Sequence, residues 1–266
     1  MCELMALSFA NPVRASISLN VFQENGVENP DGWGVAYYRN DAMQLIKEAL
    51  PASDSILYDF IERSASSKIY ISHLRRSTEG IRSYLNTHPF YRVAHMMGAR
   101  FEYAFAHNGT VADYQKLSLS KYTPLGETDS EHVFCHILEV LSNVGSSSWT
   151  RSEYQLLEEL LQAMNTPENT LNCILSDGIR LFCYSDIHDH NSGLRYSEYV
   201  PVIKLKDQAK DIGEIRVRTA GNSINTTGIK GVLVTTRDMS EGNWLEFSPG
   251  ELMVFKGGEI VYSSSG

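Results

Sequence analysis

Strand-like segments lie towards both ends of this 266-residue chain, and its most regular helical patterns lie between them. Runs rich in apolar, aromatic and β-branched residues predict strands over residues 2–8, 33–39, 44–47, 68–74, 103–107, 171–175, 179–184, 215–219, 232–236, 252–255 and 259–262. Apolar side chains at helical spacing predict helices after Pro51, after Thr128 and over 152–164. No repeat or linker interrupts this order, so we expect residues 2–266 to form a single α+β domain.

The sequence also predicts two loops and the buried face of one helix. The turn formers Asn11-Pro12 and Asn25-Gly26 predict a loop after the first strand. Residues 74–89 form a long polar loop, and loops of this length inside compact domains are often functional. The helix after Pro51 is expected to bury one apolar stripe, made of Ile56, Leu57, Phe60 and Ile61.

The charge balance restricts the partners of the chain. It has 23 Lys and Arg against 32 Asp and Glu, a formal net charge of −9, whereas nucleic-acid binding needs clustered basic side chains. No apolar run approaches the roughly 18–20 residues of a membrane span. The first residues lack a basic segment and Glu3 interrupts any apolar one, so no secretory signal is predicted. We therefore expect a cytoplasmic protein that contacts neither nucleic acid nor membrane.

Cysteine and histidine spacing predicts neither a disulfide framework nor a metal site. The four cysteines are scattered and form no C-x-x-C pair, and Cys135, Cys173 and Cys183 fall in apolar patterns typical of buried residues. His132 and His136 share a helix face at i, i+4 spacing, but no matched third ligand follows them. No cofactor is expected.

Cys2 differs from the other cysteines because of its position. Removal of the initiator Met, which is usual when the next side chain is small, leaves a thiol and a free α-amine on one residue. An α-amine titrates near 7.7–8, so a useful fraction is an unprotonated base at neutral pH. Such a residue is a nucleophile–base pair that needs no histidine.

Two further segments admit both a functional and a purely structural interpretation. Arg75-Arg76 follows a buried strand, where a guanidinium can bind a carboxylate in bidentate fashion or lie in solvent. Asn108-Gly109 closes a predicted strand, and Asn-Gly is a common hairpin turn. The same pair could supply a side-chain amide and a backbone N–H to an oxyanion.

The segment before the second helix is also open to two interpretations. Thr128 or Asp129 fits an N-cap, with Glu131 in the first turn, where the helix dipole favours a carboxylate. A carboxylate in this position could also receive a substrate ammonium.

The order of these motifs resembles the class-II glutamine amidotransferases, a group of N-terminal nucleophile hydrolases, and most of all their stand-alone YafJ-type branch. The resemblance rests on Cys2, Asn-Pro-Asp-Gly-Trp-Gly (29–34), His-x-Arg (73–75), Asn-Thr-His-Pro-Phe (86–90), Ala-His-Asn-Gly (106–109), Glu-Thr-Asp-Ser-Glu (127–131) and a C-terminal segment over 244–251. It implies a four-layer αββα sandwich in which two mostly antiparallel sheets lie between helices.

The resemblance also implies roles for individual residues. Cys2 would attack the side-chain amide carbonyl of a small glutaminyl substrate, and Asn108 and Gly109 would hold the oxyanion. Four residues would bind the substrate: Arg75, which clamps the α-carboxylate, Asp129, which pairs with the α-ammonium, and the pocket residues Thr78 and His88.

This chain departs from longer members of the family at the rim of that pocket. Arg76 stands where many of them have Trp, and Glu79 where many have His. Residues 132–266 show no second Gly-rich phosphate loop. The chain is therefore expected to hydrolyse γ-glutamyl amides itself or to pass ammonia to a separate enzyme. The third alternative is a catalytically silent binding module on the same fold. The sequence also allows a homodimer.

Overall fold

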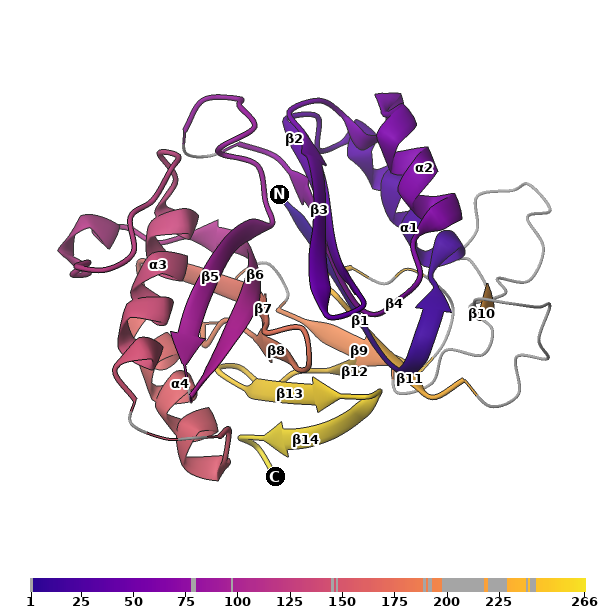
Figure 1. Cartoon of the computed structure of the whole chain (residues 1–266). Coiled ribbons are helices and arrows are strands. Elements are labelled where there is room, and N and C mark those ends of the chain that lie inside the picture. Colours follow the sequence, from indigo (N-terminus) through magenta and orange to yellow (C-terminus); the bar gives the residue numbers. More distant parts are fainter. Residues whose placement is uncertain are drawn as a thin grey trace.

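Two antiparallel sheets stack face to face, with a pair of helices on the outer side of each (Figure 1). The computed structural model describes residues 2–77, 80–96, 98–144, 146, 148–188, 190, 193–197, 218–219, 229–237, 239 and 243–266. The arrangement is the four-layer αββα sandwich that the resemblance implied.

The first sheet has the strand order β12-β9-β11-β1-β4-β2-β3, with β10 pairing with β1 off this path. Its strands are β1 (Glu3–Arg14), β2 (Gly32–Arg39), β3 (Ala42–Glu48), β4 (Ser67–Arg75), β9 (Arg195–Ser197), β10 (Arg218–Thr219), β11 (Gly231–Thr235) and β12 (Leu245–Glu246). The strands predicted over 33–39 and 44–47 are present as β2 and β3, which pair with Val35 opposite Ile46.

The second sheet has the order β14-β13-β8-β7-β6-β5. Its strands are β5 (Phe90–Met96), β6 (Ala99–Thr110), β7 (Thr170–Ser176), β8 (Leu181–Tyr184), β13 (Leu252–Lys256) and β14 (Glu259–Ser263). A hairpin around Asp177-Gly178 joins β7 to β8, and Gly178 supplies the positive φ of 85° that the connection needs.

The helices are α1 (Ser16–Glu24), α2 (Ile56–Ser64), α3 (Asp129–Ser142) and α4 (Arg151–Met164), and short 3₁₀ turns cover η1 (Asn25–Val27), η2 (Ala52–Asp54) and η3 (Tyr114–Lys116). Thr128 is the N-cap of α3, because its side chain accepts the backbone N–H of Glu131. Asp129 is therefore the first helical residue, which decides between the two N-caps the sequence allowed.

The apolar core forms three layers because side chains alternate along each strand. In β1, Met5 and Leu7 pack under α1 and α2, whereas Leu4 and Ala6 point between the sheets. In β6, Phe105 packs under α3 and α4. All three cysteines expected to be internal, Cys135, Cys173 and Cys183, are buried.

The N-terminal region differs most from the sequence-based expectation. Residues 11 and 12 lie inside β1, which runs to Arg14 through an irregularity between Ser8 and Val13, and α1 follows where a loop was predicted. The reason is tertiary, since Leu19 and Phe22 of α1 fill the outer face of the first sheet. Of the strand predicted over 215–219, only Arg218–Thr219 lies within the described residues, as β10.

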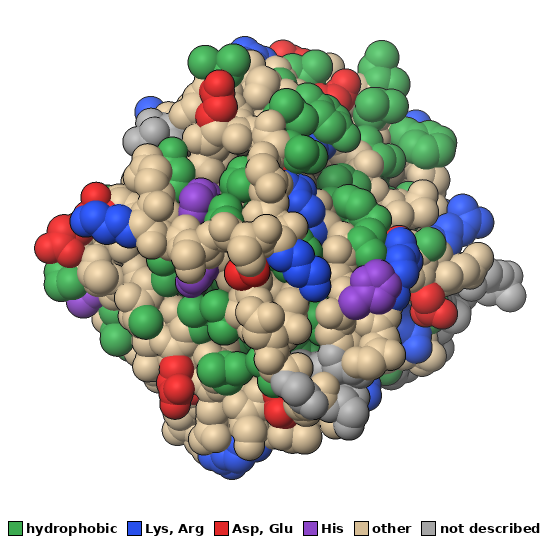
Figure 2. All heavy atoms as spheres, turned by 60° about the vertical axis from the view of Figure 1, so that its left-hand side comes forward, with side chains coloured by type: hydrophobic (Ala, Val, Ile, Leu, Met, Phe, Trp, Pro, Cys, Tyr) green, Lys and Arg blue, Asp and Glu red, His purple; other side chains and the backbone are tan. Residues whose placement is uncertain are grey.

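The predicted apolar stripe of α2 is confirmed at Ile61 and wrong at its other three positions. Tyr58 and Ile61 are buried against the sheet, whereas Ile56 and Phe60 are 84% and 59% exposed and Leu57 is also exposed. The helix is rotated because the Tyr58 ring packs edge-on against Trp33, with ring centroids 4.9 Å apart. Apolar side chains accordingly gather near the top of the surface in Figure 2. Because the two views differ by a turn about the vertical axis, this is the height at which α2 and the loop after β4 lie in Figure 1.

Candidate active site

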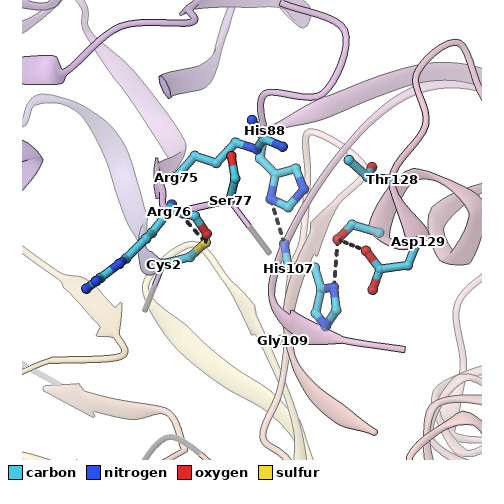
Figure 3. A pocket seen from close by; sticks show the side chains of 10 residues that line it. Cys2, Arg75, Arg76, Ser77, His88, His107, Gly109, Thr128 and Asp129 are labelled. Carbon is cyan, nitrogen blue, oxygen red and sulfur yellow. Dashed lines mark hydrogen bonds between the residues drawn. The ribbon is translucent and has the colours of Figure 1, made fainter. Parts of the chain in front are cut away.

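A pocket of about 290 Å³, counting its open mouth, lies where β1 begins, β4 ends and α3 starts (Figure 3). Ten residues line it: Cys2, Arg75, Arg76, Ser77, His88, His107, Gly109, Thr128, Asp129 and Ser130. Segments far apart in the sequence thus meet in one polar cavity, because the antiparallel pairing of β1 with β4 brings the first residue of one strand beside the last residue of the other.

The Cys2 thiol faces the chain that leaves β4. Its Sγ lies 3.2 Å from the backbone oxygen of Arg76, to which the S–H donates, and 3.2 Å from the Arg76 nitrogen, whose N–H it accepts. Burial raises the pKa of the Cys2 thiol, and the positive charge of Arg75 opposes that shift only in part. The sulfur therefore needs a base before it can act as a nucleophile.

Arg75 is the last residue of β4 and is almost fully buried. Its guanidinium donates to the backbone oxygens of Gly80 and Ile81 at 3.3 and 3.4 Å. Asp31, from the turn before β2, accepts the backbone N–H of Ser77 at 2.9 Å and so fixes the chain just beyond Arg75. The guanidinium is thereby held at the pocket by the loop that follows it.

Asp129 brings a negative charge to the opposite wall. One carboxylate oxygen accepts the backbone N–H of Val111 at 2.7 Å, and the other lies 3.3 Å from the Ser130 hydroxyl. The side chain is nearly buried and stands in the first turn of α3, where the helix dipole favours an anion. A cation at the end of strand β4 and an anion at the start of helix α3 thus face the same cavity.

Three buried histidines lie together, and two of them, His88 and His107, line the pocket. The backbone N–H of His107 donates to Nδ1 of His88 at 3.5 Å, and the rings of His73 and His88 are 4.2 Å apart. Burial lowers the pKa of His73 to about 3 and lowers those of His88 and His107 as well. All three are neutral at pH 7, so the charged side chains that line the pocket are those of Arg75, Arg76 and Asp129.

The His107 side chain has a defined tautomer. Nε2 lies 2.9 Å from the carbonyl oxygen of Thr170, which can only accept, so Nε2 carries the proton. Nδ1 then accepts the Ser130 hydroxyl at 2.9 Å. This chain of hydrogen bonds joins β7, β6 and the first turn of α3, and it fixes the position of the Asp129 backbone.

Asn108 and Gly109 do not form a hairpin turn. Both lie within β6, which runs on to Thr110 and pairs with β7 throughout, so the turn interpretation is excluded. A Cβ at Gly109 would collide with the backbone oxygen of Thr170 and lie 2.6 Å from Nε2 of His107. Only glycine fits this close approach of the two strands.

Asn108 lies beside the pocket but is not among the residues that line it. Alternation along β6 places its side chain on the face of Ala104 and Ala106, between the sheets. Within the part of the chain that the structure describes, its side-chain amide has no hydrogen-bond partner. The amide is therefore free of other hydrogen bonds among the described residues, one position along β6 from the pocket residue Gly109.

The structure thus brings together Cys2, Arg75, His88, Gly109 and Asp129 among the expected site residues and leaves Asn108 adjacent. Thr78 and Glu79 lie outside the described residues. Sequence reasoning assigned no role to three residues that hold the site: Asp31, His107 and Ser130. Each lies inside one of the motifs that carry the family resemblance (29–34, 106–109 and 127–131), and that position was the signal in the sequence that could have indicated a role.

The histidine pair on α3 hydrogen-bonds to the backbone of the preceding loop. His132 and His136 lie 2.8 and 3.0 Å from the backbone oxygens of Leu117 and Ser118 and pin the loop before the helix. Among the described residues, no three His, Cys, Asp or Glu side chains come close enough to hold a metal ion. In the same part of the chain, no helix has the length and apolar character needed to cross a membrane.

Comparison with known proteins agrees with this geometry. The family model of class-II glutamine amidotransferases matches residues 1–266. The chain therefore belongs to the class-II glutamine amidotransferases, which makes it an enzyme of glutamine amide chemistry. The αββα sandwich is of the N-terminal nucleophile hydrolase type, as expected from the resemblance.

Individual relatives match over nearly the whole chain. An uncharacterized protein of Methanocaldococcus jannaschii is 34% identical over 99% of this chain and 72% of its own length. The Escherichia coli protein YafJ is 28% identical over 98% of this chain and all of its own length. The crystal structure of a predicted glutamine amidotransferase from Pseudomonas aeruginosa is 24% identical, with a TM-score of 0.67, and covers 98% of this chain and 100% of that one.

Proposed function

We propose that this protein hydrolyses the side-chain amide of glutamine or of a γ-glutamyl amide through a thioester on Cys2. The observation that carries the proposal is one pocket lined by the Cys2 thiol, the Arg75 cation and the Asp129 anion. An α-amino acid head carries a carboxylate and an ammonium group, and each finds its opposite charge in this pocket. Residues 2–266 act together in this proposal, as a single domain.

The substrate is positioned by its head. Arg75 binds the α-carboxylate and Asp129 the α-ammonium, while the neutral imidazole of His88 lines the space between them. In this scheme substrate binding releases Arg75 from its long hydrogen bonds to the loop oxygens. Holding both ends of the zwitterion places the γ-carbonyl carbon at the sulfur, which converts attack into an intramolecular step.

The reaction then proceeds in two halves. The α-amine of Cys2, freed by loss of Met1, takes the thiol proton, and Sγ bonds to the amide carbon. The carbon–nitrogen bond breaks as the protonated α-amine gives that proton to the departing nitrogen, which leaves as ammonia or an amine. Water attacks the thioester, releases glutamate and returns the proton to sulfur. No redox partner or cofactor enters this scheme.

Asn108 and Gly109 stabilise the oxyanion of both tetrahedral intermediates. Gly109 lines the same pocket as Cys2, and the amide of the neighbouring Asn108 has no hydrogen-bond partner among the described residues, so both groups suit this role. Donors of this kind typically contribute about 3–4 kcal/mol to the stability of a transition state.

The decisive experiment joins mass measurement to assay. Purified protein should lack Met1 and release glutamate from glutamine or a γ-glutamyl amide, and Cys2→Ala should release none while unfolding at the same temperature. Insertion of one Lys between Met1 and Cys2 blocks processing and should also abolish activity. Full activity in either altered protein would refute the mechanism.

Every group in this scheme comes from one chain, so neither a homodimer nor a second enzyme is needed for the chemistry. Residues 170–176, 181–184, 252–256 and 259–263 complete the second sheet, which favours hydrolysis by this chain alone. Delivery of ammonia to a separate enzyme is the alternative. It predicts a slow glutaminase that accelerates only when the acceptor protein is added.

A further inference from the structure

A second arginine stands beside the nucleophile, on the side away from the groups proposed to bind the substrate head. The backbone N–H and oxygen of Arg76 both hydrogen-bond to the Cys2 sulfur at 3.2 Å, so the start of the Arg76 side chain is fixed against the thiol. From there the side chain extends away from Asp129, whereas the Arg75 side chain extends towards His88 (Figure 3).

The Arg76 guanidinium brings uncompensated positive charge to the mouth of the pocket. It is exposed, and within the described residues it makes no hydrogen bond or ion pair. Asp31, which accepts the Ser77 N–H at 2.9 Å, and Glu3, which pairs with Arg237 at 3.1 Å, form no ion pair with Arg76. In a chain of net charge −9, an unpaired cation at a pocket mouth attracts an anionic group of the substrate.

We propose that Arg76 selects γ-glutamyl amides whose leaving amine itself carries a carboxylate, as in γ-glutamyl amino acids. The inference rests on the proposed function. With the substrate head held by Arg75 and Asp129 and the amide carbon at Cys2, the leaving amine extends past the sulfur on the remaining side. That is the side on which the Arg76 side chain lies.

The dimensions of such a substrate fit this arrangement. In an amino-acid leaving group the carboxylate carbon lies about 2.5 Å from the scissile nitrogen, two bonds away. The carboxylate therefore falls next to the residue whose backbone touches the sulfur, within the reach of an arginine side chain. Because the pair is open to solvent, its effect is modest, about five-fold in kcat/KM, and it falls as salt rises.

The test compares two substrates that differ only in that charge. Wild-type protein should hydrolyse γ-glutamylglycine about five-fold better than γ-glutamylglycinamide, and high salt should remove the preference. Arg76→Gln should lose the preference because kcat/KM falls for γ-glutamylglycine and stays the same for γ-glutamylglycinamide. Arg82→Gln is the matched control, because Arg82 is exposed on the same loop but donates to the Ala49 oxygen at 2.7 Å. It should keep the preference.

A charge reversal guards against an indirect structural effect. Arg76→Glu should reverse the selectivity and favour the amide of ethylenediamine, whose leaving group is cationic. Equal rates for the two glycine compounds in wild-type protein, or an equal loss for both in Arg76→Gln, would overturn the inference while leaving the hydrolase intact. Absence of Cys2-dependent glutamate release from any of these amides would overturn the proposed function itself.

Discussion

The backbone N–H of Val111, just beyond the end of β6, donates to the carboxylate of Asp129, the first residue of α3, at 2.7 Å. This hydrogen bond ties the strand that carries Asn108 and Gly109 to the carboxylate proposed to bind the substrate ammonium. A short element of backbone therefore sets the spacing between the proposed oxyanion donors and the head of the substrate.

Asp129→Asn tests the charge of this carboxylate without removing the hydrogen bond, because the amide oxygen can still accept the Val111 N–H. We expect KM for glutamine to rise about ten-fold, the value of one lost charge-assisted contact, with a smaller change in kcat. Steady-state kinetics measure both. Glu127→Gln, an exposed carboxylate two residues earlier, should leave both unchanged; an unaltered KM in Asp129→Asn would remove the residue from substrate binding.

Asn108→Ala tests the proposed oxyanion donor. Since the oxyanion exists only in the transition state and intermediates, kcat should fall about 100-fold or more while KM stays within about three-fold. The melting temperature should hardly change, because the side-chain amide has no partner among the described residues. A raised KM at constant kcat would show instead that the amide contributes to substrate binding and not to stabilisation of the oxyanion.

Gly109→Ala tests the close approach of β6 to β7. The new methyl group would meet the Thr170 backbone oxygen, and neither strand can yield without breaking the ladder, so we expect a loss of about 2–3 kcal/mol of stability together with activity. Urea unfolding measures the loss. Gly98→Ala is the control: its φ of 75° is strained for alanine, but nothing lies within 4 Å, so it should cost only about 1 kcal/mol. Equal losses would contradict the packing argument.

Lys47 gives a prediction for the pH dependence of stability. Its ammonium group donates to the Thr87 oxygen at 2.6 Å, one residue before His88, and burial lowers its pKa from 10.5 to about 8. Between pH 8 and pH 10.5 the Lys47 amine carries its proton in the unfolded chain and loses it in the folded protein. The free energy of unfolding should therefore rise with pH from about 8 to about 10.5. The shift corresponds to about 3 kcal/mol.

Lys47→Met should remove that rise. Unfolding free energies from urea titrations at pH 8 and pH 10.5 provide the measurement, and the difference between wild type and variant isolates Lys47 from the other groups that titrate there. If the two proteins gain the same stability over this interval, the buried ammonium does not titrate as stated.

The strands of both sheets were mostly predictable because their side chains alternate over a few residues, and so was the start of α3, because Thr128 caps the helix locally. The long β1 and helix α1 were not. Residues 11–12 are turn formers in isolation, and strand pairing on either side of them, of residues 3–8 with β4 and of Val13 and Arg14 with β10, keeps them within β1. The exposed face of α2 was missed for a similar reason, since the packing of Tyr58 on Trp33 fixes the rotation of the helix.

The sequence alone determined which chemical groups this protein possesses: a thiol beside an amine that processing can free, a carboxylate in a helix first turn, and arginines at a strand end. Only the tertiary structure decided which of them meet. The register of β1 on β4 sets Cys2 against Arg76, and the pairing of β6 with β7 turns Asn108-Gly109 from a turn candidate into strand. Nearest neighbours along the chain fix local conformation and capping, whereas proximity, burial and pKa depend on residues that only folding brings together.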